Sequence, residues 1–153
     1  MRLSAWRIVK RKRLATALTG DGASLYPGRW NAVGVPVVYC AGSISLAVLE
    51  LLVHMEAAPR TPEYRLNEVR FDDSLVTAID ESKLPRNWRR DPAPRALALV
   101  GNRWIRDATS AVLRVPSAIT LEPNYLLNPA HPDFAKITAM RPAVFRLDAR
   151  LVN

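Results

Sequence analysis

The chain has 153 residues, of which 49% are hydrophobic, and this predicts one globular domain over residues 1–153. The composition excludes a disordered chain, and the longest apolar run, Ile44–Val53, contains Glu50 and is too short to cross a bilayer. The single cysteine, Cys40, excludes an internal disulfide framework and is expected to be a buried structural thiol. No apolar segment follows the basic N-terminus, so we expect no signal peptide, no membrane contact and a cytoplasmic protein.

In the first half of the chain, short turns separate strand-like and helix-like runs. A serine cap begins a helix whose apolar residues lie on almost every side, and this pattern predicts a buried helix. The predicted elements are a strand over Ala5–Val9, a short basic helix over 10–18, a strand over Val35–Ala41 and a helix from Ser43 or Ser45 to about Met55.

The second half of the chain adds strands, one helix and two loops. Strands and helices do not alternate strictly, so a doubly wound parallel sheet does not fit. We expect an α+β fold of twisted, mostly antiparallel sheets with packed helices. The predicted elements are strands over Tyr64–Phe71 and Leu75–Ile79, an exposed loop over Leu84–Pro94 with Trp88, a helix over Ala96–Ile105, a strand over Ala111–Val115, a loop over Asn124–Phe134 and a strand over Val144–Leu151.

The formal net charge of +8 is concentrated near the N-terminus. Residues 1–30 contain seven basic side chains and one acidic side chain, which gives a local net charge of +6. Such a surface attracts nucleic acids, nucleotide phosphates or acidic proteins, or it is solvated and has no partner. No helix-turn-helix, zinc or RNA-binding motif accompanies the charge. A non-enzymatic basic module that binds nucleic acid is therefore an alternative from a different class of function.

Three polar side chains lie in segments otherwise built for burial: Arg29 in a turn, Tyr39 in a strand and Glu50 in a helix. A buried charge is costly unless it is paired, so Glu50 either meets a cation or lines a cleft. Arg29 follows Gly28, which allows close approach of a ligand, and its guanidinium suits a phosphate or a structural pair with Glu50. Tyr39 offers a ring for stacking and a hydroxyl, or it packs in the core.

Further polar residues could bind a ligand. Glu50 has the charge that an oxocarbenium-like transition state at a glycosidic carbon requires. Ser117 follows a strand and either caps a turn or binds a phosphate or ribose, while Asn124 and Asn128 either form turns or bind a base. Two histidines and one cysteine do not make an ordinary structural zinc site, so we expect no metal.

These residues occur in an order that resembles the RES domain family, which is named for its Arg, Glu and Ser. The family supplies the toxins of bacterial RES–Xre type II toxin–antitoxin systems. The resemblance covers roughly residues 5–148. The matching pieces are Arg29-Trp30-Asn31, Gly34, Val37-Val38-Tyr39-Cys40-Ala41, Leu46-Ala47-Val48-Leu49-Glu50, Val115-Pro116-Ser117, Asn128-Pro129 and His131-Pro132.

The resemblance implies a fold similar to ADP-ribosyltransferase toxins and cleavage of the nicotinamide–ribose bond of NAD. It implies that NAD is a substrate, that no cofactor is tightly bound and that ADP-ribose passes to phosphate or water, or alternatively to a protein. Where phosphate is the acceptor, inorganic phosphate is a co-substrate of the reaction. It also implies a cognate Xre-type antitoxin, which we expect to cover the cleft or to insert a segment into it, and we expect a homo-oligomer within that complex.

The resemblance also assigns roles to individual residues. It implies that Arg29 holds the NAD phosphates, that Tyr39 stacks on or near the nicotinamide ribose and that Glu50 is the key carboxylate. The same comparison gives further NAD-binding candidates, which are Arg7, Ser117 and Asn128.

Overall fold

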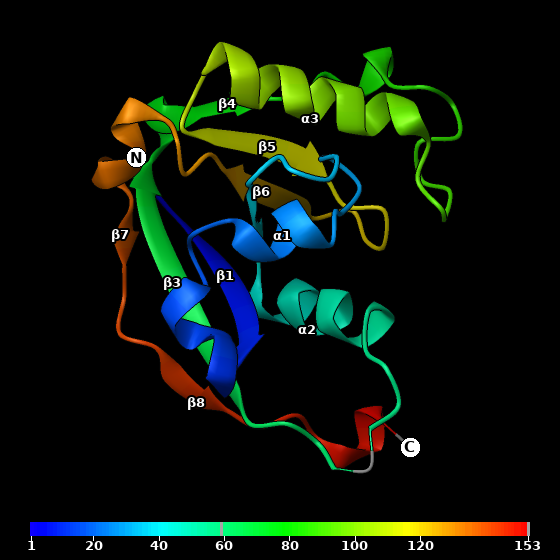
Figure 1. The fold of residues 1–153 in the computed structure, drawn as a ribbon, viewed down its shortest axis with the longest axis vertical. Helices are drawn as coiled ribbons and strands as arrows, with labels where there is room; N and C mark the ends of the chain where they lie inside the picture. Colours follow the sequence, from blue (N-terminus) through cyan, green and yellow to red (C-terminus); the bar gives the residue numbers. More distant parts are fainter. Residues whose placement is uncertain (59, 153) are drawn as a thin grey trace.

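The structure is a computed structural model that describes residues 1–58 and 60–152, and one strongly twisted sheet runs through it (Figure 1). The strands are β1 (Arg2–Lys10), β2 (Val38–Ala41), β3 (Tyr64–Asp72), β4 (Val76–Ala78), β5 (Val112–Pro116), β6 (Pro123–Leu127), β7 (Thr138–Ala139) and β8 (Ala143–Phe145). The α-helices are α1 (Asp21–Leu25), α2 (Ile44–Val53) and α3 (Arg95–Asp107). Short 3-10 helices cover Arg11–Thr16, Asp73–Leu75, Glu81–Lys83, Pro132–Lys136 and Ala149–Leu151.

The sheet has eight strands in the order β4-β5-β6-β2-β1-β3-β7, and β8 pairs with β3 beside β7. The strands β4 and β5 are parallel, and the other pairs are antiparallel. Figure 1 shows α3 lying along β4 and β5, with α1 and α2 in front of the sheet. The predicted α+β fold class is therefore confirmed, with one mixed, mostly antiparallel sheet.

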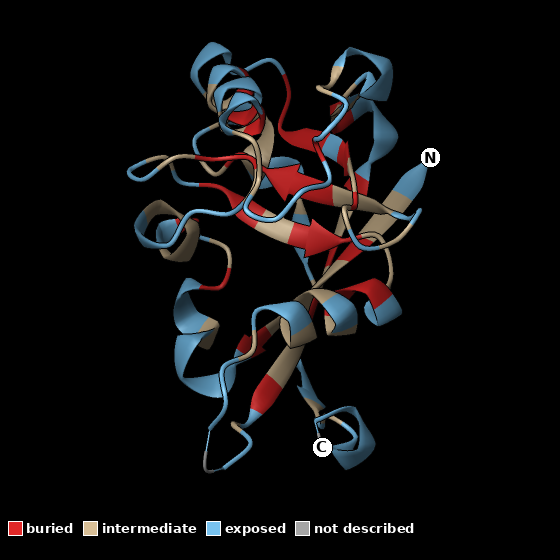
Figure 2. Cartoon of the chain, turned by 90° about the vertical axis from the view of Figure 1, so that its right-hand side faces the viewer, coloured by how far each residue is buried: buried red, intermediate tan, exposed pale blue. Residues whose placement is uncertain are grey.

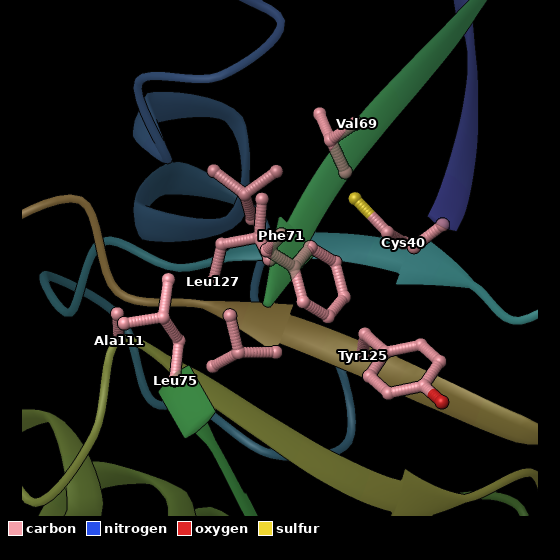
Figure 3. Packing of buried hydrophobic residues seen from close by; sticks show 10 residues of the cluster. Cys40, Val69, Phe71, Leu75, Ala111, Tyr125 and Leu127 are labelled. Atoms are coloured by element: carbon pink, nitrogen blue, oxygen red, sulfur yellow. The ribbon is translucent and has the colours of Figure 1, made fainter. Parts of the chain in front are cut away.

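Alternation along the strands divides the side chains between the two faces of the sheet. Val38 and Cys40 point to one face, where they join the largest buried cluster. Figure 3 shows this cluster, in which the rings of Phe71 and Tyr125 meet edge to face with centroids 5.5 Å apart. Cys40 is 3% exposed, which confirms the predicted buried thiol.

The opposite face of the sheet is the helix face. There α3 packs Leu97 and Trp104 over Leu113 and Leu126 of β5 and β6. A second, smaller contact joins α2 to β2 and β1, and its members are Leu46, Ala47, Ala41, Trp6 and Ile8. Tyr39 belongs to this face, so the two helices flank the strand position from which Tyr39 arises.

The predicted loop over Asn124–Phe134 is wrong at its start, because β6 runs from Pro123 to Leu127 and lies between β2 and β5. Pro123 and Asn128-Pro129 flank the strand and give the segment a turn-like composition. Between them Tyr125, Leu126 and Leu127 form a continuous apolar run, which is typical of a strand covered on both faces.

The predicted buried helix is also wrong, because α2 buries only Leu46 and Ala47. Ile44, Leu49 and Val53 are exposed by 41%, 38% and 59%. Figure 2 colours the chain by burial class, with exposed residues pale blue. The helix packs on the sheet through one side, and no described element covers its outer side. No helix in the described part of the chain is long and apolar enough to cross a membrane.

Two predicted segments near the surface also differ from the structure. The loop before α3 is polar, but Trp88 is only 6% exposed, because its ring packs with Trp30 and Trp104. The predicted last strand over Val144–Leu151 is limited to β8, because Asp148 accepts a hydrogen bond from the Arg150 amide and caps a 3-10 turn.

At Gly101, α3 lies very close to the backbone of the segment that carries Arg29. A Cβ at Gly101 would lie 1.8 Å from the carbonyl oxygen of Trp30. One residue further along α3, the Asn102 side-chain oxygen accepts a hydrogen bond of 3.1 Å from the Ala32 amide. The helix therefore holds residues 30–32 through backbone contacts that leave no room for a methyl group.

We expect Gly101→Ala to lower the free energy of unfolding by about 1–3 kcal/mol, because overpacking outweighs the better helix propensity of alanine. Urea denaturation measures the change. Gly22→Ala in α1 is the control, because a Cβ at Gly22 meets nothing within 4 Å. Equal stability of Gly101→Ala and Gly22→Ala would contradict the close approach.

Candidate active site

Tyr39 is held at its hydroxyl by the segment that precedes β2. The hydroxyl donates a hydrogen bond of 2.7 Å to the side-chain oxygen of Asn31, and it accepts one of 3.0 Å from the Trp30 amide. The ring lies against Gly28, where a Cβ would be only 2.7 Å from the ring carbon Cζ. Burial raises the pKa of Tyr39, which keeps the hydroxyl protonated.

The Asn31 side chain cross-links the segment before β2, because both its oxygen and its nitrogen make hydrogen bonds. Its oxygen accepts from the Gly28 amide at 2.8 Å in addition to the Tyr39 hydroxyl. Its nitrogen donates to the carbonyl oxygens of Ala23 at 2.7 Å and Val35 at 3.1 Å. Asn31 is 2% exposed, so this fully bonded amide is the structural centre of the turn before β2.

Arg29 points from the same turn toward the loop before α3. One guanidinium nitrogen donates to the carbonyl oxygens of Trp88 at 2.7 Å and Arg90 at 2.8 Å. The positive charge of Arg29 acts against the rise in the pKa of Tyr39. The predicted structural pair between Arg29 and Glu50 is absent from the ion pairs of the described residues.

Glu50 projects from the middle of α2 and meets a neutral partner. Its Oε1 atom accepts a hydrogen bond of 2.8 Å from the Asn124 side-chain nitrogen on β6. The contact spans 74 positions in the sequence and exists because β6 pairs with β2, directly after which α2 begins. Across the described residues, no cation lies within 4.0 Å of the Glu50 carboxylate.

Arg7 leaves β1 from the opposite pleat to its neighbours Trp6 and Ile8 and crosses toward β2. A guanidinium nitrogen donates a hydrogen bond of 2.9 Å to the backbone carbonyl of Tyr39. Its Nε atom is buried and has no partner within the described part of the chain. Burial lowers the pKa of Arg7, and the nearby Cys40 thiol, whose pKa burial raises to about 12, acts weakly against that change.

Ser117 and Asn128 are buried and bonded to their own loops. The Ser117 hydroxyl accepts hydrogen bonds from the Ile119 and Thr120 amides at 3.0 and 3.2 Å, so it fixes the turn after β5. The Asn128 side chain accepts from Ala130 at 3.0 Å and donates to Ile105 at 3.4 Å. Asn128 follows the opposite end of β6 from Asn124, about 13 Å along the strand.

The structure thus brings some of the predicted residues together and separates others. Arg29 lies in the turn before β2, and the Tyr39 hydroxyl bonds to that turn from within β2. Glu50 lies beside the neighbouring strand β6, and Asn128 lies at the far end of β6. The sequence-based assignment omitted Asn124 as a partner of Glu50, because the segment was predicted to be a loop. Among the described residues, no group of three or more His, Cys, Asp or Glu side chains is placed to hold a metal ion.

The mixed sheet, together with the polar side chains just described, defines a small α+β domain of a known type. The structure is similar to a chain of the solved M. tuberculosis MbcT–MbcA toxin–antitoxin complex, with a TM-score of 0.74 and 18% identity over 95% of this chain and 85% of that chain. The RES domain profile matches residues 4–148. The chain belongs to the RES domain family.

Curated relatives match almost the whole chain. A protein of Yersinia enterocolitica named Toxin Res is 40% identical over 148 residues, which are 95% of this chain and 97% of the relative. A protein of Sphingobium sp. named Prs ADP-ribosylating toxin is 37% identical over 159 residues, covering 100% of this chain and 99% of the relative. Together with the family match, these relatives show that the similarity to proteins named as toxins extends over almost the whole chain.

We expect Tyr39→Phe to lower the free energy of unfolding by about 1–3 kcal/mol, because the buried Trp30 amide loses its acceptor. Urea denaturation measures the loss. Tyr26→Phe removes the same hydroxyl from a side chain that is 77% exposed, and it should change the stability by less than about 0.5 kcal/mol. Equal effects of the two substitutions would show that the Tyr39 hydroxyl contributes nothing to the turn.

Proposed function

We propose that this RES toxin cleaves the bond between nicotinamide and ribose in NAD, and that residues 1–153 act as a single NAD-binding catalytic domain. In this reaction the bond from the ribose C1′ atom to the pyridinium nitrogen breaks, and its electron pair goes to the nitrogen. Nicotinamide leaves as a neutral base, so the step needs no acid on the leaving group. The positive charge that develops on the ribose is then captured by a nucleophile that loses a proton.

The observation that carries this proposal is the uncompensated charge of Glu50. The carboxylate is half-buried on the helix face, and its hydrogen-bond partner there is the neutral amide of Asn124. A half-buried carboxylate with no cation nearby attracts a substrate that develops positive charge. Preorganised electrostatic stabilisation of this kind is a large contribution to catalysis at a glycosidic carbon.

The remaining candidates receive roles that suit their chemistry. Arg29 is the proposed anchor for the diphosphate, and the Tyr39 ring is proposed to stack on or near the nicotinamide ribose. Arg7 is a further proposed phosphate contact, supported by its buried Nε atom that lacks an acceptor. Ser117 and Asn128 remain proposed contributors to NAD binding, and their bonds to neighbouring amides suggest that they act through the shapes of their loops.

A second candidate reaction is transfer of ADP-ribose to a protein. The name of the Sphingobium relative, Prs ADP-ribosylating toxin, favours it for that protein, and the match extends over the full length of both chains. The same Glu50 chemistry would serve both reactions, because only the nucleophile differs. Phosphate, water and a protein are therefore the three acceptors that an experiment has to separate. A non-enzymatic nucleic-acid-binding module would lack all three reactions.

We expect the purified chain to consume NAD, and Glu50→Gln to lower the turnover about 100- to 1000-fold, since the substitution removes the charge that faces the ribose. Liquid chromatography of NAD and nicotinamide measures the loss, with and without inorganic phosphate. Glu56→Gln, at an exposed position just beyond α2, is the matched control and should retain full turnover.

Arg29→Ala should lower both turnover and stability, because the guanidinium also holds Trp88 and Arg90.

The products distinguish the acceptors. Phosphate-dependent loss gives ADP-ribose 1″-phosphate, phosphate-independent loss gives free ADP-ribose, and label transferred from NAD to a protein indicates ADP-ribosylation. Wild-type protein that is folded and free of antitoxin, yet releases no nicotinamide in any of these assays, would refute the proposed function. Salt-sensitive binding to DNA or RNA that Glu50→Gln leaves unchanged would then favour the nucleic-acid-binding alternative.

We also propose that a cognate Xre-type antitoxin covers the site in a complex that contains more than one copy of the toxin. The structural neighbour was solved as a toxin–antitoxin complex, which supports a partner protein of this kind. Apolar side chains on the exposed side of α2, next to Glu50, support contact with a protein surface there.

We expect an equimolar or larger amount of the antitoxin to abolish NAD consumption, because a bound protein excludes NAD from Glu50. The NAD assay together with size-exclusion chromatography and light scattering measures inhibition and stoichiometry. Full activity within a stable complex would contradict the covering of the site.

A further inference from the structure

We propose that Asn124 is the positioning residue for Glu50: its amide holds one carboxylate oxygen and leaves the other to face the substrate. The inference rests on the proposed function, because it assigns Asn124 a part in the NAD reaction. Neither the family resemblance nor the sequence pattern assigned Asn124 this task.

The backbone of Asn124 is fixed from two sides. It lies opposite Ala41 of β2 and opposite Val115 of β5, so both neighbouring strands constrain it. Alternation along β6 places its side chain with Leu126 on the helix face. The amide is therefore presented to α2 from a rigid central strand, and such elements hold a functional group more precisely than loops do.

The chemistry of the two groups sets the orientation of the contact. An ionised carboxylate only accepts hydrogen bonds, so the amide nitrogen of Asn124 has to face Glu50. The nitrogen donates to Oε1 at 2.8 Å, and the donor restricts rotation of the carboxylate. Oε2 makes no hydrogen bond to any described residue. One oxygen is thus tied to the sheet, and the second is left for the developing positive charge.

The side-chain oxygen at the other end of the Asn124 amide is the observation that points to function. The Asn124 side-chain oxygen is buried and has no hydrogen-bond partner among the described residues. A buried acceptor without a partner costs about 1–3 kcal/mol, so an asparagine kept only for stability would satisfy both ends of its amide.

Two of the three asparagines that are buried as whole residues satisfy both ends, and the third, Asn67, has no buried side-chain atom without a partner among the described residues. Asn31 bonds its side-chain oxygen to Gly28 and Tyr39 and its nitrogen to Ala23 and Val35, and it organises a turn. Asn128 also bonds both its oxygen and its nitrogen to the backbone. Asn124 differs because its buried oxygen has no partner among the described residues, while its nitrogen bonds to Glu50. We infer that orientation of the carboxylate is what the side chain provides.

The test is the kinetics of NAD consumption by Asn124→Asp, which keeps the shape of the side chain and replaces the donor with an acceptor. We expect kcat to fall about 10- to 100-fold, the range found for outer partners of metal ligands. KM should change less than about twofold, because Asn124 acts on the carboxylate and leaves the NAD anchors in place. Asn87→Asp adds the same charge at an exposed position and is the control.

A double-mutant cycle separates positioning from a general structural effect. In the Glu50→Gln background the carboxylate is already gone, so adding Asn124→Asp should lower kcat less than about twofold further. A merely structural role would reduce kcat by the same factor in both backgrounds. Thermal unfolding of all variants verifies that each compared protein is folded at the assay temperature.

The outcomes keep this inference distinct from the proposed function. Wild-type protein that consumes NAD and an Asn124→Asp variant with equal kcat would overturn the positioning role alone. If Asn124→Asp lowers kcat by the same factor in the Glu50→Gln background as in the wild-type background, the positioning role would also be overturned. Wild-type protein that neither consumes NAD nor transfers ADP-ribose would overturn the proposed function and the positioning role together.

Discussion

The pairing of β6 between β2 and β5 is the constraint on which the site depends. It brings Asn124 from the second half of the chain beside the strand that leads into α2. Without this pairing Glu50 would project from a half-exposed helix toward solvent, with no fixed partner. The core has the same origin, because β6 contributes Tyr125 and Leu127 to one face and Leu126 to the other.

Stability and reactivity are divided between two regions of the helix face. Around α3, three tryptophans and a close backbone approach at Gly101 make a rigid support for the turn that carries Arg29. Around α2, few side chains are buried, and the Glu50 carboxylate forms no ion pair with any residue that the structure describes. A well-packed half thus supports a half that retains uncompensated charge and exposed apolar surface, as is common where a protein binds a ligand or partner.

The sequence predicted what depends on local pattern and missed what depends on distant pairing. Periodicity located α2, α3, β1 and β3, and charge within apolar runs singled out Arg29 and Glu50. The same reasoning assigned β6 to a loop, because prolines and asparagines at its ends outweighed three central apolar residues. It also called α2 buried, because an apolar composition does not reveal how many neighbours a helix has. Asn124 could be found only after β6 was placed beside β2.

The hydroxyl of Tyr39 donates its hydrogen bond to the side-chain oxygen of Asn31, which can only accept. The side chain therefore has no proton to give to a substrate, and Tyr39 is no general acid. The proposed cleavage of NAD is compatible with this arrangement, because nicotinamide leaves as a neutral base and needs no proton from Tyr39. A substrate whose base leaves only when protonated would have to receive that proton from a group other than Tyr39.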